Sequence, residues 1–121
     1  MKIVLGLTFL LSSFSASAGF IHPMDFDGSE SQQKEVIDYI KGKVKADYCE
    51  GAIDMCQESM LRMMEKQNLT AFKKLTQATD RKILNQVISD YCGSSIDMCN
   101  YETINMMYNQ NLKASHEKLS W

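Results

Sequence analysis

The stretch DYCEGAIDMC at positions 47–56 returns as DYCGSSIDMC at positions 90–99, 43 residues later. The likeness continues past the second cysteine, so that 13 of the 25 positions from 47 to 71 are identical to those from 90 to 114. A repeat of this kind is one structural unit used twice. The sequence therefore predicts two equivalent halves, and all four cysteines lie inside them.

Apolar residues with helical spacing precede each repeated stretch. They are Val36, Ile37, Ile40, Val44 and Tyr48 in the first copy, and Ile83, Leu84, Val87, Ile88 and Tyr91 in the second. The chain has one proline and no run of alternating β-branched residues that would indicate a strand. We therefore predict an all-α fold of two tandem helical hairpins, with about four main helices packed as one small domain.

A glycine-containing break follows the Tyr-Cys pair of each copy. We expect Gly51 and Gly93 to close the first helices in the left-handed conformation, and Ser95 to cap the helix that follows. Asp54 and Asp97 would then lie in the first turn of the second helices, where the helix dipole favours negative charge. Each second helix is therefore expected to begin before the second cysteine of its copy.

Four cysteines in an exported chain of this size predict two disulfides. Two residues seven apart on a continuous helix are separated by about 10 Å, whereas a disulfide needs Cα atoms within about 7 Å. A disulfide within one copy therefore requires the break, and we predict the local pairs Cys49–Cys56 and Cys92–Cys99. The alternative joins the copies, Cys49 to Cys92 and Cys56 to Cys99. Redox or zinc use is disfavoured by the cysteine spacing.

Residues 1–18 have the pattern of a signal peptide. A basic residue is followed by a short apolar run, and Ala16 and Ala18 supply the small side chains of a cleavage site before Gly19. We expect cleavage near Ala18-Gly19 and a periplasmic or secreted mature protein. No later stretch approaches the roughly 20 apolar residues of a transmembrane helix, so no membrane span is expected.

The mature chain is short enough to form a single domain. Polar capping residues cluster at Asn68 and at Thr76, so the second helix of the first copy ends at one of these points or continues beyond them. The predicted division is a flexible N-terminus at 19–30 and one helical domain at 31–121, with repeats at about 33–75 and 76–119.

Composition excludes several functions. The formal net charge of −2 is unlike that of a nucleic-acid-binding domain, which needs a basic surface for phosphates. The sequence has no glycine-rich phosphate loop, HExxH or GxSxG motif. We therefore predict neither enzymatic activity nor a cofactor. The lysine clusters at 41–45 and 73–74 are interpreted as solvated faces.

Nine methionines are a high number for a chain of 121 residues. Met60, Met63 and Met64 are spaced to lie on one helical face, and the second copy keeps Met106 and Met107. Thioethers are soft ligands that suit Cu(I), so copper or heavy-metal binding in the periplasm is the alternative function. The preferred interpretation is that these flexible side chains fill irregular gaps between helices.

Three aromatic residues of the second half, Tyr101, Tyr108 and Trp121, have no aromatic counterpart in the first. Aromatic side chains are the commonest anchors of protein interfaces. With no catalytic motif present, we expect a non-catalytic exported protein-binding module that uses these residues. Its partner would be another envelope or periplasmic protein, and its role that of an inhibitor, an immunity factor or an envelope-assembly accessory.

Overall fold

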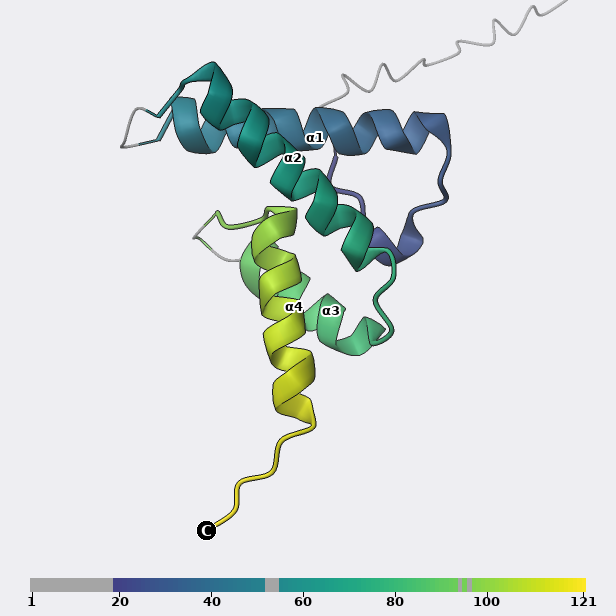
Figure 1. Ribbon diagram of the computed structural model, residues 1–121. Helices are drawn as coiled ribbons and strands as arrows, with labels where there is room; N and C mark the ends of the chain where they lie inside the picture. The colour runs from purple at the N-terminus through teal and green to yellow at the C-terminus, as the bar shows by residue number, and fades with distance from the viewer. Residues whose placement is uncertain (1–18, 52–54, 94, 96) are drawn as a thin grey trace, which may run out of the picture.

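The computed structural model describes residues 19–51, 55–93, 95 and 97–121. Over these residues the elements are a short 3-10 helix η1 (Pro23–Asp25) and the α-helices α1 (Glu30–Cys49), α2 (Glu58–Leu75), α3 (Arg81–Cys92) and α4 (Tyr101–Ser115). α1 packs on α2 and α3 on α4, and contacts between α2 and α4 join the two pairs (Figure 1). The predicted all-α fold of two hairpins is confirmed. No helix in the described part of the chain is long and apolar enough to cross a membrane.

Polar side chains set the starts of three helices. The side chains of Ser29, Asp80 and Asn100 each accept a hydrogen bond from the backbone N–H three residues further on, at 3.1, 3.0 and 2.8 Å. Such bonds satisfy N–H groups that have no partner within the helix. α2 differs, because its N-cap residue Gln57 makes no side-chain capping bond.

The two local disulfides, Cys49–Cys56 and Cys92–Cys99, are confirmed, and each brings its Cα atoms to 4.5 Å. This short separation corrects the predicted helix starts. A helix running through the second cysteine would carry it away from the first, so the chain folds back and each helix begins only after the bridge. A bond from Met55 N to Tyr48 O, 3.0 Å long, closes the first corner.

The later helix starts also correct the roles that were expected for the polar residues of the corners. Ser95 does not cap α4, because Asn100 does. Asp97 lies before α4 rather than in its first turn, and its carboxylate pairs with Lys43 Nζ at 2.7 Å. Asp54, the equivalent residue of the first copy, is outside the described residues.

The corners need glycine because a side chain would not fit there, and not because the backbone is left-handed. Gly93 has φ −97°, and Gly28 is the only described residue with positive φ. A Cβ at Gly51 would lie 2.7 Å from Asp47 O, and one at Gly93 would lie 2.7 Å from Ser89 O. The expected left-handed closure is therefore wrong, and the close approach of a carbonyl from the last turn of each helix selects glycine.

α2 runs without interruption through Asn68 and ends before Thr76. Asn68 is only 5% exposed, and its side chain serves both hairpins. Its amide nitrogen donates to Met64 O at 2.9 Å, and its oxygen accepts from Glu102 N at 3.2 Å. This polar residue links α2 to the start of α4 instead of breaking the helix.

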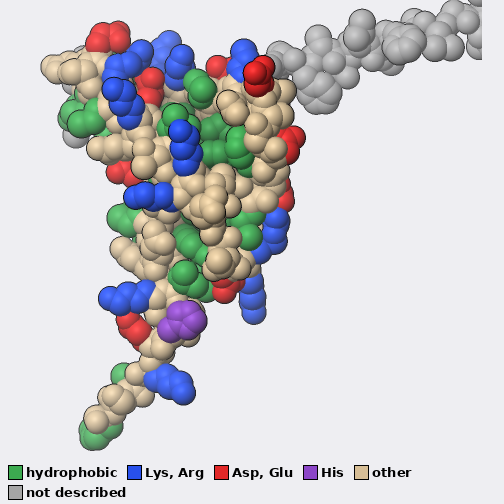
Figure 2. Space-filling view, turned by 45° about the vertical axis from the view of Figure 1, so that its right-hand side comes forward, with side chains coloured by type: hydrophobic (Ala, Val, Ile, Leu, Met, Phe, Trp, Pro, Cys, Tyr) green, Lys and Arg blue, Asp and Glu red, His purple; other side chains and the backbone are tan. Residues whose placement is uncertain are grey.

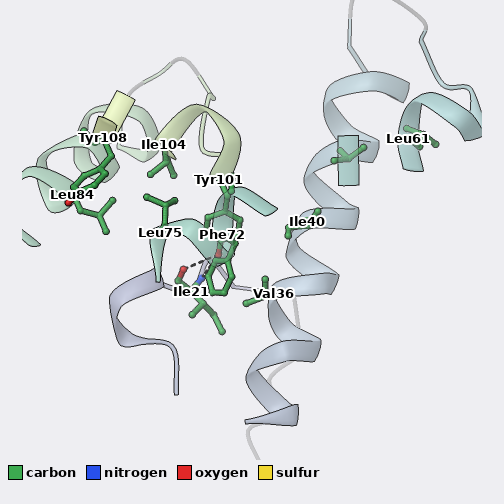
Figure 3. Close-up of a cluster of buried hydrophobic side chains, with 13 residues drawn as sticks. Ile21, Val36, Ile40, Leu61, Phe72, Leu75, Leu84, Tyr101, Ile104 and Tyr108 are labelled. Carbon is green, nitrogen blue, oxygen red and sulfur yellow. Dashed lines mark hydrogen bonds between the residues drawn. The ribbon is translucent and has the colours of Figure 1, made fainter. Parts of the chain in front are cut away.

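Residues 19–29, here called the N-terminal strap, pack against the core. Ile21 is buried, its backbone N–H donates to Tyr101 Oη at 3.1 Å, and Tyr101 Oη donates to Ile21 O at 2.9 Å (Figure 3). The ring of Phe20 stacks on that of Tyr101 with centroids 5.1 Å apart. The structure thus departs from the expected loose N-terminus, because the strap completes the core between the hairpins.

Polar contacts fix the same strap to α3. His22 Nδ1 accepts from Met24 N at 3.1 Å, and its other ring nitrogen donates to Asn85 Oδ1 at 2.6 Å. Asp25 accepts from the Arg81 guanidinium, which lowers the pKa of the Asp25 carboxyl. The strap therefore spans from the second hairpin to the entrance of α1.

Candidate functional site

Two of the three predicted partner-binding aromatics lie in the interior. Tyr101 is 0% and Tyr108 4% exposed, and Figure 3 shows both within the cluster of buried side chains. Tyr108 Oη accepts from Thr79 N at 3.2 Å and Asp80 N at 3.1 Å, and so holds the linker between the hairpins. These contacts correct the sequence interpretation, because neither ring is available to anchor a partner. Trp121 is fully exposed in the segment after α4.

The repeated methionines divide between core and surface. Met64 and Met107 occupy equivalent positions and pack against the core. Met63 and Met106 also correspond, and they are 46% and 52% exposed. Met60 is half-buried. The adjacent residues Met63 and Met64 therefore have different environments, and gap filling accounts for the inward-facing member of each pair.

An apolar depression lies between α1 and α2, and we call it the α1–α2 groove. It consists of two hollows of about 320 and 190 Å³. Residues Phe26, Gln33, Val36, Ile37, Leu69, Phe72, Lys73 and Thr76 line the first hollow, and Ile37, Ile40, Lys41, Glu65, Lys66 and Leu69 line the second. Ile37 and Leu69 belong to both hollows and form the ridge between them.

The groove arises from the apolar pattern of α1. Val36 and Ile40, four residues apart on one face, are buried against the core. Ile37 is turned away from that face and remains 40% exposed. Helical spacing predicts Ile37 in the same apolar stripe as Val36 and Ile40, but α2 covers only part of that stripe. Phe26 of the strap closes one end, where its ring packs edge-on against Phe72 with centroids 5.1 Å apart.

Basic side chains surround these hollows. Lys41, Lys66 and Lys73 line the groove, and in the described part of the chain none of their three ammonium groups has an ion-pair or hydrogen-bond partner. The one acidic residue in the lining, Glu65, is compensated by Arg62, whose Nη2 lies 2.9 Å from the carboxylate. In Figure 2, basic side chains stand beside hydrophobic surface on the upper part of the molecule, where α1 and α2 lie. The rim of the groove is therefore positive.

The titratable groups between the hairpins have structural partners. Tyr39 donates to Cys99 O, and burial, with Asp97 and Asp47 nearby, raises its pKa to about 12. Burial also raises the pKa of Tyr101. Both hydroxyls consequently stay protonated near neutral pH and act as hydrogen-bonding groups. The described residues contain no cluster of three or more His, Cys, Asp or Glu side chains able to hold a metal ion.

The groove was missed at the sequence level, although its signal is visible there. The apolar stripe of α1 includes the adjacent residues Val36 and Ile37. Lysines flank the stripe at Lys41 and, on the second helix of the hairpin, at Lys73. The sequence does not show which apolar residue the second helix leaves uncovered. No family model, curated protein or solved structure matches this chain.

Proposed function

We propose that this chain is a non-catalytic, exported protein-binding module whose α1–α2 groove receives an apolar segment of a partner protein. The observation that carries the proposal is the Ile37–Leu69 ridge between two apolar hollows, in which Ile37 is exposed and Leu69 partly buried. Apolar depressions with a few polar groups on the rim are typical of binding sites. An exposed isoleucine at the centre of such a depression gains from burial by a partner.

The composition of the groove supports binding rather than catalysis. Its lining combines apolar side chains with lysine, amide and hydroxyl groups, and its one carboxylate, that of Glu65, is paired with Arg62. No histidine or cysteine lines either hollow. The lining therefore lacks the Ser–His and Cys–His pairs of nucleophilic catalysis.

Two disulfides are consistent with an oxidising compartment. The signal peptide predicted at residues 1–18, which are outside the described residues, places the mature protein in the periplasm in this proposal. Its partner is then another envelope protein. The role that fits is that of an inhibitor, an immunity factor or an envelope-assembly accessory.

The test is crosslinked capture of partners from the native envelope, read by mass spectrometry. Wild-type protein is compared with Ile37→Asp, which puts a carboxylate on the ridge, and with Met63→Asp. Met63 is a matched control because it is exposed, lies mid-helix in α2 and is absent from the groove lining. We expect one partner to be retained by wild type and Met63→Asp and lost by Ile37→Asp.

Both variants replace an exposed helical residue, so helix propensity affects them similarly. Circular dichroism and denaturant unfolding establish that each is folded. Capture of the same partner by folded Ile37→Asp at the wild-type level would refute the groove as the binding site. Trp121→Ala, tested alongside, reports whether the exposed indole contributes to the same complex.

A further inference from the structure

We infer that the segment received by the α1–α2 groove is an amphipathic helix of about two turns whose apolar anchors are flanked by Asp and Glu. This inference rests on the proposed function and specifies the chemistry of the partner. Three features carry it: the walls of the groove, the spacing of its hollows and the charge on its rim.

The walls require a bound segment that satisfies its own backbone. Both are α-helices, α1 (Glu30–Cys49) and α2 (Glu58–Leu75), whose internal N–H and C=O groups are paired within each helix. An extended peptide lying between them would find no backbone partners, and burying unpaired N–H and C=O groups is costly. A helical segment pairs these groups internally and presents only side chains to the groove.

The hollows are spaced for helical anchors. Along α1, the first hollow is lined by Gln33, Val36 and Ile37, and the second by Ile37, Ile40 and Lys41. The pattern shifts by four residues, which is about 6 Å at 1.5 Å per residue. Apolar side chains at positions i and i+4 of a partner helix have the same spacing, so one enters each hollow and the Ile37–Leu69 ridge lies between them.

Charge on the rim selects acidic flanks. The unpaired lysines Lys41 and Lys66 stand at the second hollow and Lys73 at the first, while Glu65 is paired with Arg62. The whole chain carries a formal net charge of −2, so this positive rim is a local feature. Complementary charge around an apolar anchor speeds encounter and rejects segments of the wrong sign.

Selection from a displayed peptide library tests the inference without a known partner. The probe is a helical scaffold of about 18 residues with Leu at i and i+4, whose flanking positions vary among Asp, Glu, Lys, Arg, Gln and Ser. Selections are run in parallel on wild type, Ile37→Asp and Met63→Asp. We expect Asp- and Glu-rich flanks to be enriched by wild type and Met63→Asp, and not by Ile37→Asp.

A selected acidic peptide is then titrated by fluorescence anisotropy against wild type and the triple variant Lys41→Glu, Lys66→Glu, Lys73→Glu. We expect affinity for the triple variant to be at least about tenfold weaker, and the wild-type affinity to fall with added salt. A peptide with Lys in place of its Asp and Glu residues should show the reverse preference, which excludes misfolding of the triple variant as the cause.

The other outcomes separate this inference from the proposed function. Enrichment that depends on Ile37 but shows no charge preference would overturn the acidic helix and leave the groove as a binding site. Absence of any Ile37-dependent peptide would overturn both. Binding of dodecanoate to wild type but not to Ile37→Asp, with no peptide enriched, would overturn both in favour of a fatty-acid site.

Discussion

The two hairpins share a sequence pattern and a disulfide corner, but their first helices differ in length. α1 contains 20 residues and α3 contains 12. The positions of the second copy that correspond to 30–37 are 73–80, and these form the end of α2 and the linker to α3. The counterpart of Ile37 is consequently Asp80, the N-cap of α3. A repeated sequence thus supplies the hairpin, while the additional turns of one helix contribute residues to the α1–α2 groove.

The aromatic residues differ between the copies for a related reason. Tyr101 and Tyr108 correspond to Glu58 and Glu65 of the first copy. The tyrosines lie in the interior, where their hydroxyls bond backbone groups of the strap and the linker. Glu58 is exposed, and Glu65 lines the groove. The surplus aromatics of the second copy therefore contact the strap and the linker in the interior, whereas the equivalent glutamates of the first copy lie at the surface and in the groove lining.

The largest expected difference between equivalent positions is at Tyr101 and Glu58. Tyr101→Ala should lower the free energy of unfolding by about 3–5 kcal/mol, because it leaves a cavity among buried rings and removes two bonds to Ile21. Glu58→Ala should change it by less than about 0.5 kcal/mol. Denaturant unfolding measures both. Similar small losses for the two variants would contradict the role of Tyr101 in joining the hairpins.

The disulfide corners are expected to be equally stabilising. Both close a sequence separation of seven, so serine replacement of either pair should cost about 2–3 kcal/mol in the chain-entropy model. The local effects should differ, since α2 lacks the side-chain cap that Asn100 gives α4. Hydrogen exchange should therefore show faster opening at the start of α2 without Cys49–Cys56 than at the start of α4 without Cys92–Cys99. The opposite order would mean that the cap is unimportant.

Removing the cap of α4 and adding one to α2 tests the same difference between the two helix starts. Asn100→Ala should destabilise by about 1 kcal/mol through loss of its bond to Thr103 N. Gln57→Asn should stabilise by up to about 1 kcal/mol, because Gln57 already has the extended conformation of an N-cap (φ −100°, ψ 138°) and lacks the capping bond. Thermal unfolding of the two variants measures both changes in stability. Destabilisation by Gln57→Asn would show that the disulfide geometry excludes a cap there.

The smallest expected effect is the pH dependence of the link between Lys43 and Asp97. A hydrogen bond from Lys43 lowers the pKa of the Asp97 carboxyl in the folded protein below 3.8. The stabilisation is therefore present above the unfolded pKa and is lost as pH falls from about 5 through the folded value. Because the Asp97 side chain is 76% exposed, its contribution should be below about 1 kcal/mol.

Asp97→Asn is the variant that isolates this link. Denaturant midpoints between about pH 7 and pH 2 should fall less steeply for Asp97→Asn than for wild type. Asp38→Asn is a suitable control, since Asp38 pairs only with Lys34 on the same helix. An acid slope that is unchanged in Asp97→Asn would show that the pair does not stabilise the contact between α1 and the second corner.

The features that depend only on residues close together in the chain were predictable from the sequence. The helical periodicity, the two hairpins and the local disulfides follow from apolar spacing and from the distance limits of a cystine. The helix starts were misplaced because the sequence shows a glycine break without its geometry. Because each disulfide must close first, α2 begins only at Glu58 and α4 only at Tyr101.

The candidate site was beyond sequence reasoning because it depends on which residues another element covers. Tyr101 looked like a surface anchor and is a core residue, whereas Ile37 looked like a core residue and is 40% exposed. Burial is a relation between elements far apart in the chain, as in the 80-residue separation of Ile21 and Tyr101. No periodicity within one segment contains that relation.

The sequence by itself determined the units of this protein: helices from apolar spacing, two corners from repeated cysteines, and the equivalence of two copies. Only the tertiary structure decided which of their residues are buried and which are exposed. The strap and two tyrosines fill the space between the hairpins, and the long α1 leaves Ile37 exposed beside the three lysines of the groove. The physical reason is that backbone hydrogen bonding and bridge closure act over a few residues, whereas burial depends on the whole fold.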